Sequence, residues 1–152
     1  GENKKAYEKD AFHFRVIYSL TSKGRKIMTE LIYEQECYAI RGAVYEVYRQ
    51  MGSGFLEAVY QECLERELTE RGVPFTAQKQ VDLFYKGKKL NKHYQPDLVC
   101  YGKIIIELKA LKETSGDHQA QIINYLKATG VKIGLLVNFG HCPKATIQRF
   151  VL

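Results

Sequence analysis

The sequence has no tryptophan, only three prolines and no long apolar run. Its apolar stretches are short, such as Ile104–Ile106 and Leu135–Val137, whereas a helix that spans a bilayer needs about 20 apolar residues. A signal-peptide core is also missing, because His13 and Arg15 interrupt the Ala11–Leu20 region. These absences exclude a membrane-spanning or secreted class, and we expect a cytoplasmic protein.

The four cysteines lack the spacing of a metal or redox motif. They lie 26, 37 and 42 residues apart, so none forms a CxxC pair. This spacing excludes zinc ribbons and thioredoxin-like sites. Without a secretory signal, the cysteines are expected to be reduced and mostly buried thiols.

The charge is unevenly distributed along the 152 residues. The chain carries 23 Lys+Arg and 17 Asp+Glu, a net charge of +6, and residues 1–27 alone contribute seven and three of these, a net +4. The remaining part is nearly balanced, so its charge permits an anionic partner such as nucleic acid without requiring one. We predict a partly flexible N-terminal extension over residues 1–27 and one folded domain over residues 28–152.

Hydrophobic periodicity predicts an α/β domain built around a single mixed sheet. Helical patterns cover Glu30–Tyr48, Phe55–Arg71 and Asp117–Thr129. Strand patterns cover four segments, with a fifth strand at the end as an option: Phe75–Tyr85, His93–Tyr101, Lys103–Leu108, Val131–Asn138 and Thr146–Val151. The predicted order is α-α-β-β-β-α-β.

Charged residues stand at unusual positions in the third of these strands. Glu107 and Lys109 are two residues apart, so their side chains leave the same face of the strand, while Ile104, Ile106 and Leu108 point the other way into a core. Asp97 lies on the neighbouring strand. Burying such charges in an apolar strand is costly unless a partner compensates them. Two carboxylates and the backbone carbonyl of Leu108 offer hard oxygen ligands for Mg²⁺ or Mn²⁺. Such a metal polarises a phosphoryl oxygen and activates water, and Lys109 is placed to orient that water.

The segment Pro96-Asp97 with Glu107-x-Lys109 resembles the signature of the PD-(D/E)xK nuclease superfamily. Residues Gly54–Tyr60 are similar to the GxxExxY motif of one bacterial family within it. The resemblance covers about residues 30–152 and includes three later segments: Gln121–Gly130, Val137–Gly140 and Arg149–Leu152.

This resemblance implies a restriction-endonuclease-like core and a metal-dependent phosphodiester hydrolase acting on DNA or RNA. The family pattern makes Glu57, Asp97 and Glu107 metal ligands and Lys109 the catalytic lysine. It also makes Gln121 and Tyr125 a QxxxY pair that orients the lysine or contacts a phosphate. A homodimer through the last strand or the extension is a further expectation.

Simpler interpretations stay open for most of these residues. Asp97 is also a turn residue after Pro96, and Glu107 with Lys109 also fits the solvated face of an edge strand. Glu57 suits the positive end of a helix dipole. The two tyrosines of the motifs, Tyr60 and Tyr125, also fit core packing.

A basic hairpin offers a separate nucleic-acid candidate. Four lysines crowd the predicted turn between the first two strands: Lys86, Lys88, Lys89 and Lys92. They suit a phosphate backbone, although edge lysines also discourage aggregation.

Two functions other than a nuclease remain open: a non-catalytic module that binds nucleic acid or another partner, and a hydrolase of small phosphoesters or nucleotides.

Overall fold

The computed structural model describes residues 32–152, so the predicted extension over residues 1–27 lies outside the described residues. Two helices open this part and a third follows the fifth strand: α1 (Glu34–Met51), α2 (Glu57–Glu70) and α3 (Gly116–Thr129). The strands are β1 (Phe75–Ala77), β2 (Val81–Tyr85), β3 (Lys88–Tyr94), β4 (Leu98–Cys100), β5 (Ile104–Lys109), β6 (Ile133–Asn138) and β7 (Thr146–Val151).

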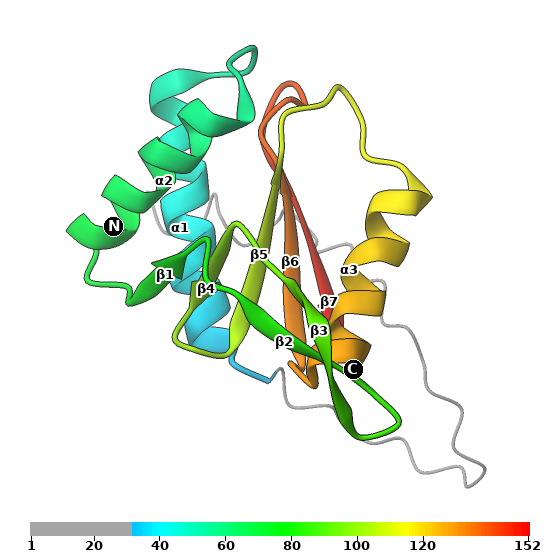
Figure 1. The fold of residues 1–152 in the computed structure, drawn as a ribbon. Helices are drawn as coiled ribbons and strands as arrows, with labels where there is room; N and C mark the ends of the chain where they lie inside the picture. Colours follow the sequence, from blue (N-terminus) through cyan, green and yellow to red (C-terminus); the bar gives the residue numbers. More distant parts are fainter. Residues whose placement is uncertain (1–31) are drawn as a thin grey trace, which may run out of the picture.

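Five strands form a central mixed sheet in the order β1-β4-β5-β6-β7. Only the β5–β6 pair is parallel, and the other neighbours are antiparallel. Helices α1 and α2 cover one face, while α3 covers the other (Figure 1). This arrangement confirms the predicted α/β class with a restriction-endonuclease-like core.

The prediction of a single sheet was wrong, because two predicted strands are each divided in two. Phe75–Tyr85 breaks after β1, where Gln78 adopts a left-handed φ of 52°. His93–Tyr101 breaks at Pro96, a residue with no N–H to donate to a ladder. The freed segments β2 and β3 pair with each other as a separate antiparallel hairpin. The break at Gln78 is fixed by its N–H, which donates to the Asp97 carbonyl at 3.1 Å.

The two faces of the sheet have separate cores. Ile104, Ile106 and Leu108 of β5 belong to the larger cluster with α1 and α2. Ile105 belongs to the smaller cluster beneath α3 and the hairpin. This alternation matches the predicted division of the strand, and it determines which side chains of β5 remain available for a site.

Two other expectations can be compared with the structure. All four cysteines are unbonded, and Cys37 and Cys100 are buried whereas Cys142 is exposed. No helix within residues 32–152 has both the length and the apolar character to cross a lipid bilayer.

Candidate functional site

Asp97 and Glu107 meet on the α3 side of the sheet. Leu98 of β4 pairs with Ile106 of β5, so Asp97, one residue before Leu98, lies opposite Glu107. A tight turn at Gly102, with φ of 67°, joins the two strands. The Asp97 carboxyl group is close enough to the Glu107 carboxyl group to raise its pKa. The structure therefore brings these two predicted residues together.

The Glu107 carboxyl group has a pKa well above its ordinary value. Its pKa is raised to about 7: burial is the largest cause and the Asp97 carboxylate adds to it, while Tyr94 and Lys109 act in the opposite direction. Like-charged carboxylates in a partly buried place resist ionising together. A cation between them would relieve that repulsion.

Asp97 is fixed by the main chain of β5. Its Oδ2 accepts a hydrogen bond from the Leu108 N–H at 2.7 Å. The Lys109 carbonyl accepts from the Phe139 N–H at 2.8 Å and therefore points toward β6. Because carbonyls alternate along a strand, the Leu108 carbonyl points to the opposite edge, where Asp97 lies. Lys109 itself is half-buried on the face of Glu107.

Tyr94 is a member of the site that sequence reasoning missed. Its hydroxyl donates a hydrogen bond to Glu107 Oε1. Its ring stacks on Tyr125 of α3, with centroids 3.6 Å apart and planes 8° from parallel. Burial, followed by the Glu107 charge, raises the pKa of Tyr94, so the hydroxyl keeps its proton and remains a donor. The sequence gives no signal for this contact, because it depends on how the hairpin packs.

No contact of Gln121 or Glu57 with this pair is seen, and both side chains are exposed. Gln121 is exposed on α3, one turn before Tyr125. Glu57 is exposed in the first turn of α2. The same helix reaches Asp97 one turn later, where Gln61 Nε2 donates to the Asp97 carbonyl at 3.3 Å. Within residues 32–152, no three His, Cys, Asp or Glu side chains are close enough together to hold a metal ion, so a ligand role for Glu57 stays a prediction.

Tyr60, the last residue of the GxxExxY-like segment, belongs to the core. It is fully buried, and its hydroxyl donates to the Gly52 carbonyl at 2.6 Å. Its ring stacks on Phe139 at 4.5 Å between centroids. The structure thus agrees with the core-packing interpretation of this tyrosine.

The four hairpin lysines are all exposed. Lys89 forms an ion pair with Asp82 at 2.9 Å, and the Lys86 ammonium lies 5.5 Å from the ring centroid of Tyr85. The strand pairing places Lys88 on the side of the hairpin that also carries Tyr94, and Lys92 lies where the register of β2 and β3 shifts. The strand that carries Tyr94 therefore exposes several positive charges.

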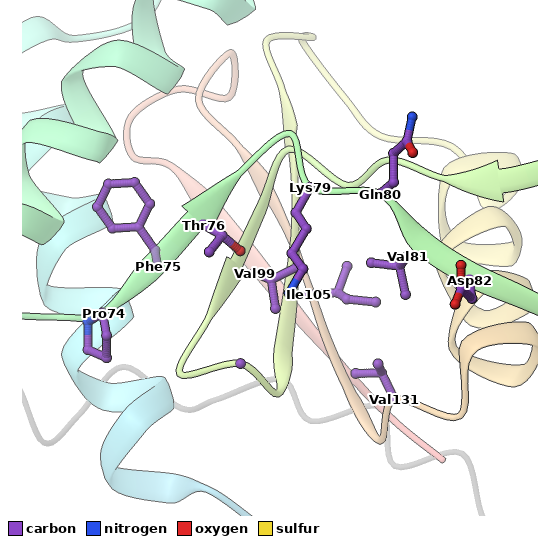
Figure 2. A pocket seen from close by; sticks show the side chains of 11 residues that line it. Pro74, Phe75, Thr76, Lys79, Gln80, Val81, Asp82, Val99, Ile105 and Val131 are labelled. Carbon is purple, nitrogen blue, oxygen red and sulfur yellow. The ribbon is translucent and has the colours of Figure 1, made fainter.

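A hollow of about 370 Å³ lies on the same face of the sheet. Val99 and Ile105 form its floor, and each is two residues from Asp97 or Glu107. Figure 2 shows Lys79 beside Val99 and Ile105, and Gln80 farther out. The two carboxylates are not among its lining residues, so the hollow adjoins the acidic pair and does not enclose it.

The donor set suits a hard divalent cation. Mg²⁺ is usually held by one or two carboxylates, with waters and substrate phosphates completing the shell. Asp97 and Glu107 supply two carboxylates, and the Leu108 carbonyl faces the same edge. The residues present therefore fit a divalent-metal site.

One comparison with known proteins confirms the superfamily part of the resemblance, and none tests the smaller GxxExxY family. The profile of the PD-(D/E)XK nuclease superfamily matches residues 34–150. A search of curated proteins gives no significant match. A solved structure described as "Crystal structure of SSO0001" is similar with a TM-score of 0.48 and 19% identity over 79% of this chain. The match covers 59% of that protein, less than two thirds of its length.

Proposed function

The chain belongs to the PD-(D/E)XK nuclease superfamily, and from that premise we propose that it is a metal-dependent phosphodiester hydrolase acting on DNA or RNA. The observation that carries the proposal is the facing pair Asp97 and Glu107 with Lys109 on the same side of β5. Buried like charges beside a lysine are typical of a catalytic centre more than of a structural strand. Within the superfamily, the GxxExxY-like segment Gly54–Tyr60 supports assignment to that smaller family.

Asp97 and Glu107, with the Leu108 carbonyl, would hold Mg²⁺ or Mn²⁺. Glu57 is the proposed further ligand. It lies one helical turn before Gln61, whose side chain contacts the Asp97 main chain. When bound, the metal would polarise a phosphoryl oxygen and lower the pKa of the attacking water.

Lys109 is the proposed catalytic lysine. Its ammonium group would orient the attacking water and stabilise the charge that develops on the phosphate. Gln121 and Tyr125 on α3 would support the lysine or contact a neighbouring phosphate. The hairpin lysines Lys88 and Lys92 would hold the backbone of the nucleic acid, because both are exposed on the strand that carries Tyr94.

A panel of single- and double-stranded DNA and RNA, incubated with Mg²⁺ and with Mn²⁺, tests this function. We expect the wild-type protein to cleave at least one substrate, and Asp97→Ala and Lys109→Ala to abolish cleavage. Lys103→Ala is the matched control, because Lys103 stands at the other end of the same strand segment and pairs with Glu36 on the α1 side at 2.8 Å.

Two outcomes would contradict the proposal. If the wild-type protein cleaves nothing but binds nucleic acid with a steep salt dependence, the chain is a binding module with a nuclease-like fold. If it hydrolyses only small phosphoesters or nucleotides, the nucleic-acid substrate is wrong.

A further inference from the structure

We propose that Tyr94 is a positioning residue that orients Glu107 for metal binding and joins the β2–β3 hairpin to the acidic pair. This inference rests on the proposed function and extends it to a residue outside the superfamily signature. Tyr94 is the only buried residue of β3, whose residues from Lys88 to His93 are all exposed.

Two contacts fix Tyr94 in place. Its ring is 6% exposed and lies flat against Tyr125 of α3. Its hydroxyl reaches from the hairpin to Glu107 Oε1 on the central sheet. It is therefore held by one element, α3, while it contacts a side chain from another, β5.

The segment between Tyr94 and Asp97 is also fixed. Gln95 Nε2 donates to the Gln78 carbonyl at 2.6 Å, and the Gln78 N–H donates to the Asp97 carbonyl at 3.1 Å. The chain cannot slide between the hairpin and β4 without breaking these bonds. Tyr94 and Asp97, three residues apart, thus approach Glu107 from fixed positions.

A glutamate needs such a partner because its terminal torsion is broad and only weakly restricted. The Tyr94 hydroxyl donates a hydrogen bond to Oε1 of Glu107, and the Asp97 carboxyl group is close enough to the same carboxylate to raise its pKa. Partners of this kind orient a metal ligand, and losing one typically weakens metal binding or activity by about 10- to 100-fold. Tyr94 acts through Glu107 and is not itself a ligand.

The test measures Mn²⁺ binding by the metal-free protein, using calorimetry on wild type and Tyr94→Phe. The phenylalanine keeps the stack on Tyr125 and removes only the hydroxyl. We expect the dissociation constant for Mn²⁺ to rise about 10-fold or more, with a cooperative thermal transition retained. Tyr48→Phe is the matched control, since it removes a hydroxyl that donates to the His141 carbonyl at 2.8 Å from α1. That control is expected to bind Mn²⁺ as tightly as wild type.

A second measurement separates positioning from general damage. If the wild type cleaves a substrate, activity lost in Tyr94→Phe at low Mg²⁺ should return as Mg²⁺ is raised, because only metal affinity is impaired. A folded Tyr94→Phe protein with wild-type Mn²⁺ affinity would overturn the role of Tyr94 alone. A wild-type protein that binds no Mn²⁺ would overturn the metal-dependent function, and the role of Tyr94 with it.

Discussion

The two faces of β5 differ in composition although they belong to one strand of six residues. On the α1 and α2 side, Ile104, Ile106 and Leu108 are at most 1% exposed within the larger core. On the α3 side, Ile105 is followed by the half-buried charged residues Glu107 and Lys109. The strand anchors the fold with one face and presents charged groups with the other.

The α3 side tolerates these charges because its cover is incomplete. The hairpin and α3 bury Tyr94 and shield Glu107, while the adjoining hollow keeps the region open. Shielding is sufficient to raise the pKa of Glu107 to about 7, chiefly through burial. If the proposed function holds, this comparison predicts that changes on the two faces separate activity from stability.

The largest expected effect is the loss of activity in Glu107→Gln. This change keeps the size of the side chain and removes its charge, so we expect cleavage to fall by at least about 100-fold. The free energy of unfolding should not decrease, because a costly buried charge is replaced by a neutral amide. Cleavage rates on a substrate from the panel, together with urea unfolding, measure both quantities. A strong loss of stability would show that Glu107 supports the fold.

The opposite face is tested by Ile106→Ala. Ile106 is fully buried between β4 and β6 beneath α1 and α2. Removing a buried isoleucine side chain to alanine costs about 2–5 kcal/mol of unfolding free energy. Well below the lowered melting temperature, we expect the variant to retain cleavage within a few-fold of wild type. An unchanged melting temperature would contradict the assignment of this face to the core.

Local patterns predicted much of the fold. The alternation in β5 correctly separated Ile104, Ile106 and Leu108 from the charged face, because a half-buried strand has a period of two. The Lys86-Gly87 turn was also readable, and both residues have positive φ, at 48° and 74°. The division of Phe75–Tyr85 was not readable, because it depends on a bond between Gln78 and Asp97, nineteen positions apart.

The candidate site was predictable only where its members lie on paired strands. Asp97 and Glu107 are joined by a short antiparallel connection, so their proximity follows from the sequence. Tyr94 reaches Glu107 only because a second sheet folds over the first and α3 supplies Tyr125. Such packing between separate elements leaves no local pattern in the sequence.

The stability of the metal-free protein should depend on pH because the Glu107 carboxyl group on the α3 side titrates. Glu107 has a pKa of about 7 in the folded protein, above its ordinary value of 4.5. The folded state therefore binds the Glu107 proton more tightly than the unfolded state does. The stabilisation that this proton gives is complete below pH 4.5 and is lost as pH rises through 7. The loss is at most about 3 kcal/mol. Urea unfolding in chelator across this range should show it, and Glu107→Gln should remove this contribution. If the free energy of unfolding changes with pH by the same amount in wild type and in Glu107→Gln, this role of Glu107 is contradicted.

The smallest expected effect concerns the hairpin. Lys92 is exposed two residues before Tyr94, so it is the hairpin lysine nearest in sequence to the residue that contacts Glu107. Lys92→Ala should weaken nucleic-acid binding similarly for all sequences and reduce the slope of log affinity against log salt by about 1. Fluorescence anisotropy of a labelled oligonucleotide over several salt concentrations measures that slope. Lys103→Ala makes the same change in charge on the α1 side, where Lys103 pairs with Glu36, and should leave the slope unchanged. If both variants lower the slope equally, binding follows net charge and the distinction between the two faces does not extend to substrate binding.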